Sequence, residues 1–302
     1  MKPPRDNTLE QGENSTPASR VTWFPGHMRK AQNRLAEEVK ACNVVVELRD
    51  ARLPVSSANP ELEKIIGGRQ RLVVFNKTSL ADPACSSLWQ AHFESRGLAC
   101  LFMDAGNSRD NGLLVKRLEQ MSKPYMEGFR RRGIRPPSPR VMVVGIPNVG
   151  KSTLINRLAG KKKQTTGPVP GTTRALNWVL VKERFHLLDS PGVMLPRIQT
   201  DEDAFRFGWI GTLPDHLVGR ERVAASLLDH FLPALPAGLF AHYQLSLPPV
   251  GLNGQAVLEW LAGQKQVLKK KGVPDTARMA EILMTDFRKG ILGRYTLEMP
   301  GL

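Results

Sequence analysis

The residues best suited to chemistry form a glycine-rich loop in the middle of the chain, Gly-Ile-Pro-Asn-Val-Gly-Lys-Ser at residues 145–152. Glycines at this spacing let backbone N–H groups point at phosphate oxygens, and the helix that follows adds a favourable dipole. We predict that Lys151 is catalytic, because its charge reaches the β- and γ-phosphates of a nucleotide, and that Ser152 is a ligand of Mg²⁺. The other nucleotide contacts predicted in this loop and directly after it are Asn148, Val149, Gly150 and Thr153.

Two later segments add groups that a nucleotide site needs. Asp189 opens an Asp-Ser-Pro-Gly run at the end of a predicted strand, where its carboxylate holds Mg²⁺ through water and the N–H of Gly192 meets the γ-phosphate. Before it, residues 167–174 (Gly-Pro-Val-Pro-Gly-Thr-Thr-Arg) are typical of a loop that senses the nucleotide through a hydroxyl. We predict Thr173 as that Mg²⁺ ligand, with Thr172 as the alternative; the competing interpretation is a plain surface loop.

A second motif, Asn-Lys-Thr-Ser at residues 76–79, lies well before the phosphate loop. A guanine-reading loop has the pattern Asn-Lys-x-Asp, in which the Asp accepts two hydrogen bonds from the N1 and N2 edge of the base. Hydrogen bonds to a charged group contribute roughly 1.5–3 kcal/mol against about 1 kcal/mol for neutral ones, so Ser79 predicts weaker selection of GTP over ATP. The backbone of residues 104–106 is a further candidate contact with the base. The base-binding residues predicted here are Asn76, Lys77, Thr78 and Ser79.

The elements that must position these motifs alternate between strands and helices, which is typical of a mostly parallel sheet. The base-reading loop precedes the phosphate loop, the reverse of the usual order in a GTPase. We therefore predict an α/β fold with a circularly permuted P-loop GTPase domain. Apolar runs predict strands at 44–48, 71–75, 99–103, 140–144, 176–181 and 185–188, and helical spacing predicts helices at 28–41, 84–96, 112–121 and 151–159.

Beyond about residue 200 the strand signals fade, and helical spacing appears near 202–211, 221–232, 255–270 and 275–289. This change predicts a small all-helical domain after the GTPase domain. No apolar run reaches the ~18 residues of a membrane span. The predicted division is a disordered tail at 1–20, the GTPase domain at 21–200 with a basic connector at 124–140, and the helical domain at 201–302.

The chain of 302 residues is strongly basic, with a net charge of +15 and a pI of about 10.1. Nucleic acid is the commonest soluble polyanion, so this excess favours a nucleic-acid partner, with contacts mostly to the phosphates of folded RNA. The competing interpretation is a solvated surface that serves solubility. The positive charge gathers in the connector (Arg130, Arg131, Arg132, Arg135, Arg140), at Lys161–Lys163 and Lys269–Lys271, and at Arg278, Arg288 and Lys289.

The order of the two loops resembles that of the circularly permuted GTPases. Within these, the phosphate motifs, Trp-Phe-Pro-Gly-His-Met at residues 23–28, Asp-Ala-Arg at 50–52 and Phe-Arg-Lys-Gly-Ile-Leu-Gly-Arg at 287–294 are similar to the ribosome biogenesis GTPase A family (YlqF-like), which has mitochondrial relatives. The resemblance runs from about residue 20 to the C-terminus. It implies a GTPase that assists late assembly of the large ribosomal subunit and binds its rRNA when loaded with GTP. We expect a monomer.

The resemblance also implies roles around the γ-phosphate. Family members lack the water-orienting glutamine after Asp-x-x-Gly, and Val193 stands at that place in this chain. Their substitute is the histidine of the Trp-Phe-Pro-Gly-His-Met segment, so His27 is the matching catalytic candidate; without the family, an isolated histidine there is more often a turn residue. Asn148 matches the asparagine that helps to hold K⁺ beside the phosphates in potassium-stimulated relatives.

Three functions fit these residues. The first is a slow GTPase, with GTP, Mg²⁺ and K⁺ as cofactors, that assembles the large ribosomal subunit and couples its nucleotide state to RNA through residues 193–211. The second is a nucleotide-gated RNA-binding module with negligible turnover, which Ser79 and Val193 favour. The third is an NTPase of relaxed base specificity without a ribosomal role. The acidic start of the chain favours the bacterial cytoplasm, with the mitochondrial matrix as the alternative.

Overall fold

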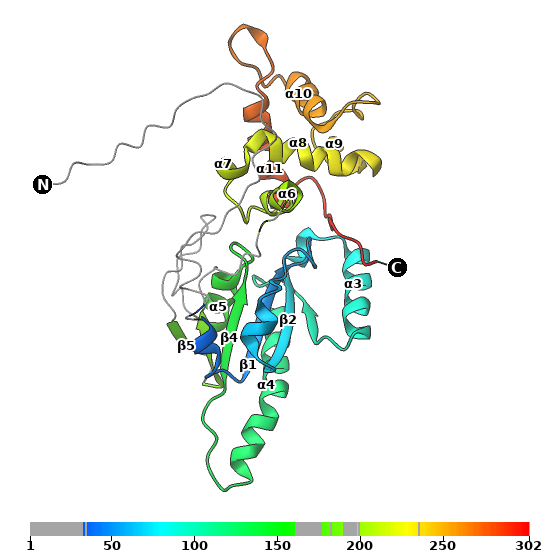
Figure 1. Ribbon diagram of the computed structural model, residues 1–302. Coiled ribbons are helices and arrows are strands. Elements are labelled where there is room, and N and C mark those ends of the chain that lie inside the picture. The colour runs from blue at the N-terminus through cyan, green and yellow to red at the C-terminus, as the bar shows by residue number, and fades with distance from the viewer. Residues whose placement is uncertain are drawn as a thin grey trace, which may run out of the picture.

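A mostly parallel sheet forms the centre of one half of the molecule (Figure 1). The computed structural model describes residues 33, 35–160, 177–181, 183–189, 198, 200–234 and 236–301. Within these residues the sheet has the order β3-β2-β1-β4-β6-β5, and only the β5–β6 pair is antiparallel. The predicted α/β class is confirmed. The strands are β1 (Val44–Asp50), β2 (Gln70–Asn76), β3 (Cys100–Phe102), β4 (Arg140–Gly145), β5 (Asn177–Val181) and β6 (Phe185–Asp189).

The register of the central strands brings the two nucleotide motifs to the same edge of the sheet. β4, which leads into the phosphate loop, pairs with β1 so that Gly145 lies opposite Leu48. β1 in turn pairs with β2 so that Asp50 lies opposite Asn76, the first residue of the base-reading motif. Because all three strands are parallel, their carboxyl ends meet, as in other open α/β sheets that bind ligands at this edge. The inverted order along the chain therefore still produces one common edge.

The helices agree with the predicted ones where the apolar spacing is long. Residue 33 and residues 35–39 are helical, within the range predicted near the start of the chain. The short helices α2, α7 and α9 were not predicted, because four or five residues are too few to show a helical period. The helices are α2 (Leu62–Ile66), α3 (Pro83–Ser95), α4 (Ser108–Arg130), α5 (Lys151–Ala159), α6 (Asp201–Trp209), α7 (Asp215–Val218), α8 (Arg220–Phe231), α9 (Ala237–Ala241), α10 (Gly254–Gln264) and α11 (Thr276–Lys289).

The predicted end of the helix near residue 121 is wrong, because α4 continues through Pro124 to Arg130. A proline removes one backbone donor, but its fixed φ is compatible with a helix. Beyond it, the rings of Tyr125 and Phe129 contact each other edge to face one turn apart, with centroids 5.1 Å apart. The first part of the predicted connector is therefore helical, and the non-helical link to β4 begins after Arg130.

The helices from α6 onward gather at the end of the sheet where β1, β2 and β4 stop (Figure 1). α8 lies at their centre and packs against α6, α10 and α11 through a buried apolar face that includes Val223, Leu227 and Leu228. One cluster of buried apolar side chains runs from the sheet into these helices without a break. The division into domains at residue 200 therefore stays a prediction. In the part of the chain that the structure describes, no helix is both long and apolar enough to cross a bilayer.

The last residues, 290–301, return from α11 to the sheet and end beside α3 (Figure 1). We call this segment the C-terminal arm. Its backbone pairs with two loops of the sheet, since Tyr295 N donates to Leu80 O at 3.0 Å and Leu297 N donates to Arg52 O at 2.8 Å. The indole of Trp89 in α3 donates to Glu298 O at 2.9 Å. The arm thus connects the end of the chain to the loops after β1 and β2.

Candidate nucleotide site

The phosphate loop joins β4 to α5 in a backbone shape that requires glycine. A Cβ at Gly150 (φ 106°) would lie 2.2 Å from the Asn76 side-chain nitrogen, and one at Gly145 would lie 2.4 Å from Leu48 O. Lys151 begins α5 and is only 6% exposed; its ammonium donates to Gly145 O at 2.8 Å and to Ile146 O at 2.9 Å. The backbone of the loop therefore surrounds the Lys151 ammonium, which is the position from which this lysine contacts phosphate oxygens in P-loop proteins.

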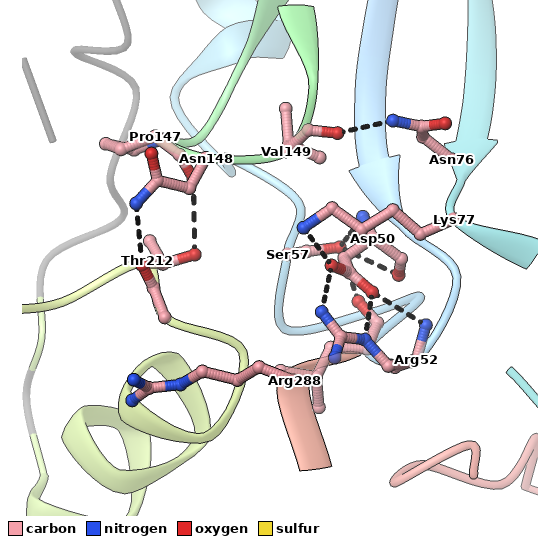
Figure 2. Close-up of polar contacts among 12 residues, drawn as sticks. Asp50, Arg52, Ser57, Asn76, Lys77, Pro147, Asn148, Val149, Thr212 and Arg288 are labelled. Carbon is pink, nitrogen blue, oxygen red and sulfur yellow. Dashed lines mark hydrogen bonds and ion pairs between the residues drawn. The ribbon is translucent and has the colours of Figure 1, made fainter. Parts of the chain in front are cut away.

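Asn76 connects the base-reading motif to the phosphate loop (Figure 2). Its side-chain amide nitrogen donates to Val149 O at 2.6 Å, and its amide oxygen accepts from Ala105 N at 2.8 Å. The side chain is 4% exposed, so both bonds form away from bulk water. Three segments that are distant in sequence thus meet at one side chain. The two predicted motifs therefore lie side by side, and that they bind one nucleotide stays a prediction.

Lys77 and its partners form a buried ionic cluster under the base-reading motif. The Lys77 ammonium lies 3.0 Å from the Asp50 carboxylate, which also accepts two bonds from the Arg52 guanidinium at 2.9 and 2.8 Å (Figure 2). Burial alone would raise the pKa of Asp50, but Arg52 and Lys77 outweigh burial and hold that pKa well below its usual value. Burial also lowers the pKa of Lys77, against the opposing effect of Asp50. The cluster fixes Lys77, whose backbone is left-handed (φ 66°).

Thr78 and Ser79 bind a side chain that the sequence did not single out. Both Thr78 Oγ1 and Ser79 N donate to Asp104 Oδ2, at 2.8 and 2.9 Å, and Ser79 Oγ donates to Asp104 Oδ1 at 3.0 Å. Residues 104–106 were expected to offer only backbone to the base. The available signal was an acidic residue two positions after β3, the strand that neighbours β2 in the sheet.

The C-terminal arm supports the same motif from the outside. Arg294 Nε donates to Ala81 O at 3.0 Å, and its Nη2 donates to Thr78 O at 2.9 Å. The Glu298 carboxylate accepts from Val55 N at 2.7 Å and from Ser56 N at 3.0 Å, in the turn after β1. Sequence reasoning missed both residues as site residues, because their partners lie more than two hundred positions earlier along the chain.

The helical half of the molecule contacts the phosphate loop directly (Figure 2). Asn148 is left-handed (φ 58°), and its amide nitrogen donates to Gly211 O at 2.7 Å. Thr212, which is 1% exposed, donates from Oγ1 to Pro147 O at 3.3 Å. The phosphate loop and the segment after α6 therefore form one hydrogen-bonded unit.

Arg288, which is 25% exposed, links the end of α6 and the start of α7 to α11. It donates to Gly208 O at 2.6 Å and to Trp209 O at 3.3 Å, and it pairs with Asp215 at 2.6 Å. These partners occupy much of the guanidinium, and contact between Arg288 and RNA stays a prediction. The other basic residues predicted for the connector, the link after α10 and α11 are exposed: Arg130, Arg131, Arg132, Arg135, Arg140, Lys269, Lys270, Lys271, Arg278 and Lys289.

The described part of the site fits Mg²⁺ as far as it extends. Ser152 and Thr153 lie in the first turn of α5, and β6 ends at Asp189, opposite Val143 of the phosphate-loop strand. Hydroxyl and carboxylate oxygens are the hard donors that Mg²⁺ prefers, and that these residues surround one ion stays a prediction. His27, Thr173 and Gly192, together with the Asp189 side chain and Lys161–Lys163, lie outside the described residues.

Comparison with known proteins identifies the family. A family model described as 50S ribosome-binding GTPase matches residues 140–220. Ribosome biogenesis GTPase A of Bacillus pumilus is 32% identical over 280 residues, which cover 93% of this chain and 99% of that protein. Mitochondrial ribosome-associated GTPase 1 of Mus musculus is 33% identical and covers 91% of this chain, with 89% of its own length matched.

Solved structures agree with the family. GDP-bound YlqF has a TM-score of 0.65 and 25% identity, over 88% of this chain and 99% of that one. A GNP-bound YlqF from T. maritima gives the same TM-score and identity over 90% and 98%. With the inverted motif order and one shared edge of the sheet, these matches show that the chain is a circularly permuted P-loop GTPase of the ribosome biogenesis GTPase A family.

Proposed function

We propose that this GTPase is an assembly factor that binds the large ribosomal subunit through its rRNA when loaded with GTP. The support is the family itself, since relatives carry names that refer to ribosome biogenesis and to the mitochondrial ribosome. The single observation that carries the coupling to nucleotide is the bond from Asn148 of the phosphate loop to Gly211 after α6. A monomer, and a bacterial cytoplasmic rather than a mitochondrial location, stay predictions.

The proposed roles follow the positions of the side chains. Asn76, with its neighbours on the base-reading motif, binds the base, while Lys151 donates to the β- and γ-phosphates. Water attacks the γ-phosphate in line, and the positive charge of Lys151 with the backbone N–H groups of the loop stabilises the charge that develops. Mg²⁺, when bound, neutralises the phosphate oxygens. Further proposed contacts are Lys77, Thr78, Ser79, Val149, Gly150 and Thr153 for the nucleotide, Gly192 for the γ-phosphate, Ser152, Thr173 and Asp189 for Mg²⁺, Asn148 Oδ1 for K⁺, and His27 for the attacking water.

The gating follows from where the phosphate loop touches the helices. Asn148 and Pro147 both bond to the segment after α6, and Arg288 of α11 bonds to Gly208 at the end of α6, just before that segment. A γ-phosphate that changes the shape of the loop therefore acts on α6 and α11 through two short hydrogen-bonded steps. A ligand shifts a conformational equilibrium only through such differential contacts. Nucleotide state is thereby linked to the helices that are proposed to bind RNA.

The exposed basic residues suit an extended RNA surface rather than a compact one. Arg130 ends α4 and Arg131 and Arg132 follow it, whereas Lys269–Lys271 lie in the link between α10 and α11 (Figure 1). These two groups are at opposite ends of the molecule in that view. Contacts at both ends would be mainly to phosphates, so binding should weaken steeply with salt.

The proposal is tested by co-sedimentation with isolated large and small ribosomal subunits, in a GTP analogue, in GDP and without nucleotide. We expect binding to the large subunit that is strongest with the GTP analogue, and no such dependence for Lys151→Ala. Equal binding in all three states would contradict the gating, and failure to bind large subunits would contradict the ribosomal role.

Phosphate release separates this function from the second candidate, a nucleotide-gated RNA-binding module. Release is measured with and without large subunits, in K⁺ and in Na⁺. The assembly GTPase is expected to turn over faster on the subunit and in K⁺. Negligible turnover in every condition, with nucleotide-dependent binding retained, would favour the second function instead.

A further inference from the structure

Ser79 stands where the guanine-reading motif has an aspartate, and the carboxylate of Asp104 lies within hydrogen-bond distance of its hydroxyl. Guanine presents two donors side by side, N1–H and the N2 amine, and a selective site needs two acceptors opposite them. Ser79 Oγ and Asp104 Oδ1 lie 3.0 Å apart, and both belong to loops at the edge of the sheet where the base-reading motif ends. Ser79 is exposed and Asp104 is partly exposed, so both can meet a ligand.

The hydrogen bonds leave acceptors available on this pair. Asp104 Oδ2 accepts two bonds, from Thr78 Oγ1 and Ser79 N, whereas Oδ1 accepts one bond in the part of the chain that the structure describes. A hydroxyl has one proton and two lone pairs, and the Ser79 hydroxyl uses its proton in the hydrogen bond that it donates to Asp104 Oδ1. Ser79 Oγ is then an acceptor polarised by a carboxylate, next to a carboxylate oxygen. A bond of this kind is stronger than one to an isolated hydroxyl.

The neighbouring contacts place the pair beside the base-reading motif and close to the phosphate loop. Ala105, next to Asp104, donates to the same Asn76 side chain that donates to Val149 of the phosphate loop. Asp104 N is itself fixed by Asp110 Oδ2 at 2.9 Å. The carboxylate is therefore held by its own neighbours and by the base-reading motif at the same time, which is the pre-organisation that a specific contact needs.

We propose that Asp104, acting with Ser79, reads the N1 and N2 edge of guanine in place of the aspartate that the motif lacks. Adenine has an acceptor at N1 and no amine at C2, so it loses both bonds and places its N1 lone pair against the carboxylate. The chain should then select GTP over ATP despite Ser79. The inference rests on the nucleotide site alone and not on the ribosomal role, and its test uses no ribosome.

The test is displacement of a fluorescent GDP analogue by GTP, ATP and XTP. XTP has a carbonyl at C2, so a side-chain amide at position 104 would donate to it. The native chain is expected to prefer GTP over ATP by roughly a hundredfold, because each of the two hydrogen bonds to the base contributes about tenfold. Asp104→Asn is expected to lower GTP affinity by about tenfold and to raise XTP affinity. Unchanged GTP:ATP and GTP:XTP ratios in this variant would overturn the proposal.

Asp104 also supports its loop, so ratios between nucleotides decide the matter rather than absolute affinity. Asp110→Asn is the matched control, because Asp110 fixes the same backbone and does not contact Ser79; its ratios should equal those of the native chain. Two further variants move the carboxylate from one position to the other. Asp104→Ser is expected to lose the preference for GTP over ATP, and the double variant Ser79→Asp with Asp104→Ser is expected to regain it. A parallel loss for all three nucleotides, without recovery in the double variant, would show that Asp104 only supports the loop.

Discussion

Asp50 is a buried carboxylate held between two cations, Arg52 and Lys77. Removal of one partner from a buried ionic cluster is strongly destabilising, because the remaining charges lose their compensation. Asp50→Asn should therefore lower the free energy of unfolding by roughly 3–5 kcal/mol at pH 7, measured by urea denaturation. Glu127→Gln, at an exposed pair 4.0 Å from Arg131, is the matched control and should change it by less than about 0.5 kcal/mol.

The same residue predicts the direction of the pH dependence. The pKa of Asp50 is lower in the folded chain than its unfolded value of about 3.9, so its stabilisation is present above that pH and is lost as the pH falls toward the folded value. The native chain should lose stability on acidification below about pH 4, and Asp50→Asn should lose less over the same interval. An equal acid sensitivity of the two proteins would contradict this assignment.

At the scale of single residues, the positions of side chains that belong to a local motif could be predicted from the sequence. Lys151 and Asn76 have their expected places because glycine spacing and strand ends determine them locally. The side-chain contacts of Asp104, Arg294 and Thr212 were not predicted, since each joins a loop from a different part of the chain. No local pattern records such a tertiary contact.

At the scale of elements, the C-terminal arm is predicted to support the base-reading motif. Arg294→Ala removes the bonds to Thr78 O and Ala81 O. GTP affinity should fall by about 1 kcal/mol, or roughly fivefold, because the guanidinium is exposed and its bonds are only partly shielded from water. Lys289→Ala, an exposed cation at the end of α11, is the control and should bind GTP like the native chain. Equal affinities in a titration of both variants would argue against a role for the arm.

The elements were predictable where burial determines the pattern. Central strands such as β1 and β4 are buried on both faces and read as continuous apolar runs. The end of α4 was misplaced because proline usually ends a helix, yet α4 continues through Pro124. The helix predicted to reach residue 270 ends at Gln264, since the chain turns at Gln266 (φ 54°). Turn geometry of this kind depends on packing that the sequence does not show.

At the scale of the whole molecule, the contact between the phosphate loop and the helices should carry the nucleotide signal. Thr212→Val keeps the shape of the buried side chain and removes its bond to Pro147 O. The ratio of large-subunit binding in GTP analogue to that in GDP should fall, while GTP affinity stays within about twofold of the native value. Thr276→Val, which removes a bond to Glu221 within the helices, is the matched control and should keep the ratio. A ratio that is unchanged in Thr212→Val would mean that the signal takes another route.

The central claim is that two loops, distant in sequence and in inverted order, hold one GTP molecule. Calorimetric titration with GTP of the native chain, Asn76→Ala and Lys151→Ala tests it most directly, with thermal unfolding as the check that each variant is folded. The structure predicts one nucleotide per chain and an affinity loss of at least about tenfold in each variant, because each removes a contact to the same ligand. A folded Asn76→Ala that binds GTP like the native chain, or a second independent nucleotide site, would contradict the account.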